Sequence, residues 1–153
     1  MGNNVLPQAK ASRIEQDGAL RRIPGLTLGE YYADQPVFFI HSGLLNLHTA
    51  TAASGYALIP FPAKIISVQL ALTEQAGTGP ALVLAGHVGD LDAYVDDYSV
   101  ATADAVGLYD LTEEDAFVNS VIDAGDVVVF STDGGATTTG TAFMTLICVP
   151  TLV

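Results

Sequence analysis

The chain has 153 residues, half of them apolar, which is enough for one domain whose core needs no covalent staples. Charged residues make up only 14%, against about 25% in an ordinary soluble domain. The net charge of −12 excludes a body that binds nucleic-acid phosphates or an anionic membrane surface. The single cysteine excludes an internal disulfide, and neither a transmembrane run nor a signal peptide is predicted.

The first 36 residues differ from the rest of the chain, since they hold three prolines and little strand-like alternation. They also hold four of the five basic residues, which are Lys10, Arg13, Arg21 and Arg22. We expect residues 1–36 to form an extended arm with a short helical turn capped by Ser12. The arm's basic residues are expected to dock on acidic protein surface, either a partner or the body of a neighbouring copy. A disordered tail is the alternative.

From residue 37 onward the pattern is that of β-strands. Ile66, Val68, Leu70 and Leu72 alternate with polar residues, which predicts a strand with one face in the core. With the Gly-rich turn that follows, this strand predicts a hairpin over residues 64–89.

A second hairpin is predicted over residues 126–149. Its last strand is apolar on both faces near its end. We therefore expect that strand in mid-sheet, with its outer face covered by the arm or by another subunit.

The acidic segment "DLDAYVDDYS" is expected to be a loop. Asp90, Asp92, Asp96 and Asp97 offer the oxygen ligands that calcium prefers. Their spacing does not match an EF-hand, because Tyr94 stands where a third Asp or Asn belongs. We expect a solvated acidic loop, with a calcium site as the alternative.

The chain holds no convincing catalytic constellation. No two of His41, His48 and His87 have the spacing of two that a metal pair on one strand face requires. No Ser stands in a G-x-S-x-G elbow. Cys148 lies in an apolar strand without a basic neighbour, which predicts a buried, inert thiol. We expect a protein that is not an enzyme and has no cofactor and no metal.

Several short strands with Gly-rich turns and no long helical period predict an all-β fold. The domain organisation that follows is an N-terminal arm over residues 1–36 and a single β-sandwich over 37–153. A jelly roll is the favoured topology, although the order of strand pairing cannot be derived from the sequence.

Two stretches, "IPFPAKIISVQLALTEQAGTGPALVLAGHVG" and "VIDAGDVVVFSTDGGATTTGTAFMTLICV", resemble small β-sandwich structural proteins of tailed bacteriophages. Among these, the capsid cement or decoration proteins fit the size best. The likeness covers residues 55–150. It consists of a Pro-marked strand entry, an alternating Val/Leu strand, Gly-Thr turns and the "AGDVVVFSTDGG" hairpin.

The resemblance implies a non-catalytic virion protein, assembled in the host cytoplasm and seated on the capsid surface. Such a protein binds and stabilises the lattice of the major capsid protein through its sandwich and its N-terminal arm. The family also implies a homo-oligomer, often a trimer. With the acidic composition, it leaves no place for a nucleic-acid or membrane partner.

Other readings stay open. Tail, neck and fibre proteins of phages share this strand style, so a role in one of those parts is the first alternative. An alternative of another class is a calcium- or carbohydrate-binding β-sandwich module, although the absence of Trp counts against a sugar-stacking platform. An unrecognised hydrolase would require a concave site with perturbed carboxylates.

Overall fold

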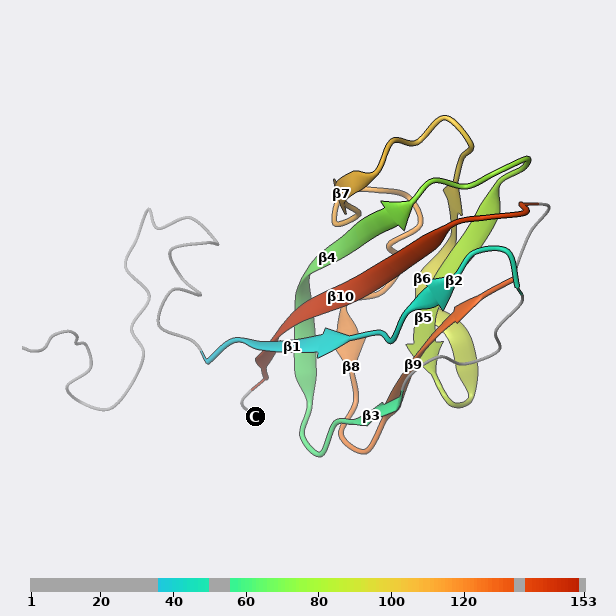
Figure 1. Cartoon of the computed structure of the whole chain (residues 1–153). Coiled ribbons are helices and arrows are strands. Elements are labelled where there is room, and N and C mark those ends of the chain that lie inside the picture. Colours follow the sequence, from blue (N-terminus) through green and yellow to red (C-terminus); the bar gives the residue numbers. More distant parts are fainter. Residues whose placement is uncertain (1–35, 50–55, 134–136, 152–153) are drawn as a thin grey trace, which may run out of the picture. The chain divides into compact units, whose positions relative to one another are not determined.

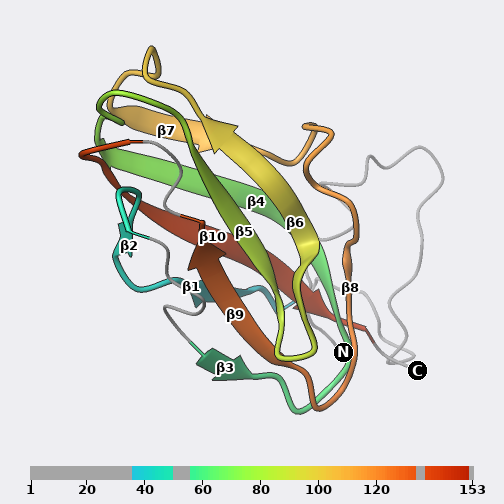
Figure 2. The ribbon, with the colours of Figure 1, turned by 90° about the vertical axis from the view of Figure 1, so that its right-hand side faces the viewer.

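The computed structural model describes residues 36–49, 56–133 and 137–151. Within these residues there is no helix, and so none that could cross a membrane. Two antiparallel sheets face each other (Figures 1 and 2), which confirms the predicted all-β sandwich. The strands are β1 (Phe38–His41), β2 (Leu45–Asn46), β3 (Tyr56–Leu58), β4 (Ala63–Glu74), β5 (Ala81–His87), β6 (Asp90–Val100), β7 (Gly107–Asp110), β8 (Val121–Ile122), β9 (Val127–Thr132) and β10 (Thr141–Pro150).

The larger sheet has six strands in the order β1-β10-β4-β7, with β2 added beside β10 and β8 beside β4. The smaller sheet has four strands in the order β3-β9-β5-β6. The strand β10 therefore lies in mid-sheet between β1 and β4, as its apolar composition predicted.

The two predicted hairpins are not formed. The strand β4 belongs to the six-stranded sheet and β5 to the four-stranded sheet, and β9 and β10 are divided in the same way. The Gly-rich turn between β4 and β5 therefore carries the chain from one sheet to the other (Figure 2). The strand β5 pairs instead with β6 and β9. Alternation and turn residues predict strand–turn–strand, but they do not say which sheet the second strand joins.

The alternation of β4 is confirmed with one correction. Val68 and Leu70 are buried as predicted, but the next core position belongs to Ile65 rather than Ile66. The ladder between β4 and β10 shifts register between Ser67 and Ile65, so β4 contains one extra residue there. Such a bulge changes the phase of the alternation, which a strict period of two does not predict.

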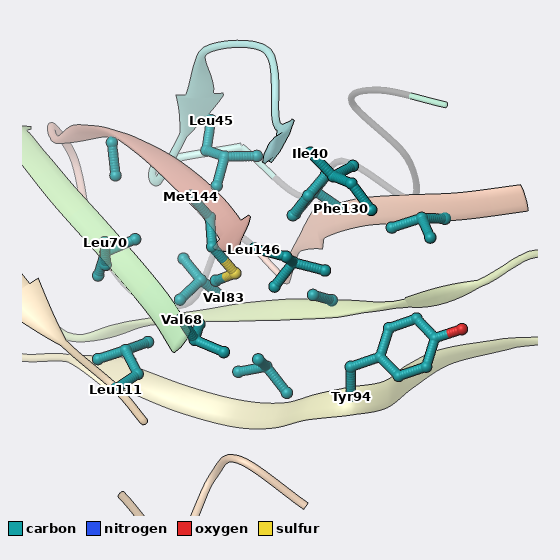
Figure 3. Packing of buried hydrophobic residues seen from close by; sticks show 14 of the residues in the cluster. Ile40, Leu45, Val68, Leu70, Val83, Tyr94, Leu111, Phe130, Met144 and Leu146 are labelled. Atoms are coloured by element: carbon teal, nitrogen blue, oxygen red, sulfur yellow. The ribbon is translucent and has the colours of Figure 1, made fainter. Parts of the chain in front are cut away.

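The core lies between the two sheets (Figure 3). The side chains of both inner faces meet there, and burial of each large one contributes about 1.5–3 kcal/mol. The six-stranded sheet contributes Val68, Leu70, Met144 and Leu146, and the four-stranded sheet contributes Val83, Tyr94 and Phe130.

The acidic segment that was expected to be a loop is the strand β6, so that expectation is wrong. Tyr94, Val95 and Val100 of this strand are buried, while its carboxylates stay exposed. Packing of these side chains against the core outweighs the low β-propensity of Asp. At Asp97 the backbone takes a positive φ of 50°, where the ladder with β5 shifts register. Asp tolerates that conformation better than most residues.

Candidate interaction surfaces

The four residues predicted to form the interaction arm lie outside the described residues. Lys10, Arg13, Arg21 and Arg22 therefore remain a prediction, as do the bounds of the arm itself. From residue 36 onward the chain holds Lys64 against thirteen acidic residues. Whatever binds this part of the chain meets a strongly negative body.

Four of these acids lie on the exposed positions of β6. A hydrogen bond from the protonated carboxyl group of Asp90 to the carboxylate of Asp92, followed by desolvation, raises the pKa of Asp90 above its usual range. Desolvation and the neighbouring charge of Asp96 raise the pKa of Asp97 in the same direction. No cluster of three or more His, Cys, Asp or Glu side chains within the described ranges is arranged to hold a metal ion. The calcium alternative therefore finds no ligand set in that part of the chain.

The three histidines lie on separate elements. His41 ends β1, His48 lies in the turn after β2, and His87 ends β5. His41 and His48 do not share a strand, because β1 ends at His41. The ring of His87 lies beside the ring of Tyr94, with 6.0 Å between the ring centres.

Cys148 faces the core from β10 and is fully buried, as predicted. Burial raises the pKa of its thiol to about 12. Since the thiolate is the reactive form of cysteine, this thiol is inert in the folded protein.

The outward side of the six-stranded sheet has a polar row across its centre. His41, Thr145, Gln69 and Asp110 are successive partners across β1, β10, β4 and β7. Nδ1 of His41 lies 2.9 Å from Oγ1 of Thr145. At the other end of the row, hydrogen bonds from Thr112, assisted by Gln69, hold the pKa of Asp110 below its usual range. The carboxyl group of Asp110 is therefore ionised at neutral pH.

Apolar side chains lie on both sides of this polar row. The flanking rows are Phe143–Ala71–Leu108 and Phe39–Ile147–Ser67. Leu108 is 71% exposed, Phe39 56% and Phe143 41%. We call these three rows together the outer face. Several large exposed apolar side chains on one face of a sheet are typical of a contact surface.

The sequence indicated only part of the outer face. The last strand was predicted to be apolar on both faces near its end, and in the structure its outward face carries Phe143 and Ile147. Phe39 and Leu108 were missed, because their place beside β10 and β4 depends on strand pairing between distant segments. The sequence does show an apolar residue at each of these positions. Such a residue in a short strand does not indicate which strands will lie beside it.

The fold and this surface define a single β-sandwich with an open, largely uncharged outer face. The described fold is similar to that of a chain in the solved structure of the cyanophage Pam1 capsid asymmetric unit, with a TM-score of 0.51 and 15% sequence identity. The similarity covers 92% of this chain and 100% of the other chain. No protein-family model matches the sequence. No curated protein matches it either.

Proposed function

We propose that this protein is a non-catalytic virion structural protein of the capsid cement class. It binds the outside of a phage shell and stabilises the lattice of the major capsid protein. The observation that carries the proposal is the shared fold with a chain of the Pam1 capsid asymmetric unit, which extends over the full length of that chain. A shared fold supports a shared role only by analogy, so the surfaces of this chain have to support it as well.

The strand order supports the assignment. The sheets β1-β10-β4-β7 and β3-β9-β5-β6 are joined by turns that cross repeatedly from one sheet to the other. This arrangement favours the eight-stranded jelly roll expected from the sequence, a fold that viral capsid domains use. The short strands β2 and β8 extend the ladders of β10 and β4.

The exposed apolar side chains support a protein that works by contact. Besides the outer face, the strand β3 exposes Tyr56 and Leu58 on the other sheet. A chain with large apolar residues exposed on both sheets and with few charges has surface for more than one neighbour. A cement protein needs that property, since it bridges adjacent shell subunits.

The basic arm provides a second contact with the assembly. Lys10, Arg13, Arg21 and Arg22 lie in the sequence segment that precedes Pro36 and the strand β1 (Phe38–His41). We expect this segment to dock on acidic protein surface of the assembly. Its four positive charges then steer and align the contact more than they strengthen it.

Co-sedimentation of the purified protein with shells that lack it tests the proposal. We expect saturable binding with a fixed number of copies per shell subunit. If the protein does not bind shells but co-purifies with detached tails or necks, the cement role is wrong and the tail or neck alternative replaces it.

A further inference from the structure

We propose that the outer face binds the same face of a second copy of this chain, about a two-fold axis that runs along the strands between β4 and β10. This self-association goes beyond the proposed function, since it requires no shell. It predicts a two-fold dimer, whereas the resemblance implied an oligomer that is often a trimer. The sizes, the charges and the strand register of side chains on the outer face all favour this pairing.

The sizes of the side chains on β10 and β4 are complementary. Phe143 on β10 has the small Ala71 as its partner on β4, and Ile147 has the small Ser67. The proposed rotation carries β10 of one copy over β4 of the other. Phe143 of one copy then lies opposite Ala71 of the other, and Ile147 lies opposite Ser67. The two faces therefore interlock, as the inner faces of packed sheets do. Because the same patch serves both copies, the contact is closed and isologous.

The ends of the polar row are also complementary. Asp110 lies on β7 at one end of the row, and His41 lies on β1 at the other end. The same rotation places Asp110 of each copy opposite His41 of the other. A carboxylate opposite an imidazole ring is a favourable pair, whether the ring is neutral and donates a hydrogen bond or is protonated.

The charge of the whole body favours this face over others. Two bodies that each hold thirteen acids against one lysine repel each other wherever carboxylates would meet. Within the three rows of the outer face, Asp110 is the one acid, and in the proposed pair it meets an imidazole. The four acids of β6 belong to the other sheet. The outer face is therefore a surface through which two copies can approach without opposed carboxylates.

The outer face exposes large apolar side chains that such a contact would bury. Phe39, Phe143 and Leu108 are the large apolar side chains that it would remove from water. Shell protein and the segment of residues 1–35 are the other possible occupants, and the experiment below separates them from a second copy.

Sedimentation equilibrium of the full-length protein, over a range of concentrations, tests the pairing. We expect the wild type to form a dimer. Phe143→Glu, which places a carboxylate opposite Ala71 of the second copy, should weaken the dimer by at least about tenfold in Kd. The control is Leu58→Glu on β3, an even more exposed apolar position outside the outer face, which should leave the dimer unchanged.

A charge exchange tests the register. His41→Asp should weaken the dimer by about tenfold, because the new carboxylate faces Asp110 of the second copy. Adding Asp110→Lys to the same chain should restore most of the affinity. Thermal melts check that all variants fold. A wild type that is monomeric at every concentration would overturn the proposal, whether the face is then covered by shell protein or by residues 1–35. An oligomer of any size that survives Phe143→Glu and His41→Asp would overturn it as well.

Discussion

The hydroxyl group of Tyr94 donates a hydrogen bond of 2.9 Å to Oδ2 of Asp126. Tyr94 lies on β6, and Asp126 directly precedes β9, so the bond spans the strand β5 that separates them. The same carboxylate oxygen accepts a hydrogen bond of 3.1 Å from the backbone nitrogen of Asp123. Burial, followed by the bond to Asp126, raises the pKa of Tyr94 above its usual value. The phenol therefore remains a donor and holds the turn before β9 against the sheet.

Removing this bond should destabilise the fold. We expect Tyr94→Phe to lower the free energy of unfolding by about 1–2 kcal/mol, since the half-buried Asp126 loses a charge-assisted partner. The measurement is urea denaturation followed by circular dichroism. Tyr109→Phe is the control, because the Tyr109 hydroxyl donates to the backbone oxygen of Ala105 at an exposed site where water can replace it. Equal losses in both variants would contradict this account of the bond.

Close approach of two backbone segments requires Gly86. A Cβ atom at this position would overlap the backbone oxygen of Asp90 and would lie 2.5 Å from the carbonyl carbon of Leu91. Backbone atoms cannot move aside as side chains do, so Gly86→Ala should cost about 2–3 kcal/mol of stability. Thermal and urea unfolding measure the loss.

Gly89→Ala is the matched control in the same hairpin. The Cβ atom there would meet only the ring of His87 at 3.6 Å, which is ordinary contact. We expect a change of less than about 0.5 kcal/mol. If Gly89→Ala is as damaging as Gly86→Ala, general strain in the hairpin rather than the close approach explains the effect.

The buried thiol of Cys148 makes stability fall at alkaline pH. Its pKa is raised to about 12 in the folded protein, so the unfolded chain loses the proton first as the pH rises. The unfolded state then binds fewer protons than the folded state, and stability decreases from pH 9 up to pH 12. The raised pKa of Tyr94 acts in the same direction above pH 10.

Two measurements check this prediction. Urea midpoints between pH 8 and pH 11 should fall for the wild type and fall less for Cys148→Ala, compared with its own value at pH 8. A thiol reagent should label the native protein slowly and the urea-unfolded protein rapidly. Rapid labelling of the native protein would show that Cys148 is accessible.

The predicted arm can be tested by reversing its charge in the full-length protein. We expect Arg21→Glu combined with Arg22→Glu to reduce the rate of shell binding, and the reduction should be largest at low salt. Lys64→Glu, on β4, is the control for a change of charge in the body. If the control slows binding as much as the arm variant, then net charge rather than the arm governs the contact.

Local patterns in the sequence predicted the sandwich and the inward positions Val68, Leu70 and Leu72, because alternation follows directly from strand geometry. The mid-sheet place of β10 could be predicted from its two apolar faces. The division of β4 from β5, and of β9 from β10, could not, since it depends on packing between distant segments. The strand β6 was mistaken for a loop because its acids masked the buried Tyr94 and Val95.

The outer face was only half predictable for the same reason. Phe143 and Ile147 follow from the alternation of one strand, whereas their neighbours Phe39 and Leu108 come from segments far away in the chain. Predicting the polar row between His41 and Asp110 requires the register of four strands, and no local sequence pattern specifies that register.

The rupture temperature of shells with and without this protein tests the cement role most directly. Shells that lack the protein are heated alone and with the wild-type protein. Release of their contents is followed by dye fluorescence. We predict that saturating wild-type protein raises the rupture temperature by several degrees. A rupture temperature that does not change, although the protein is bound to the shell, would contradict the account.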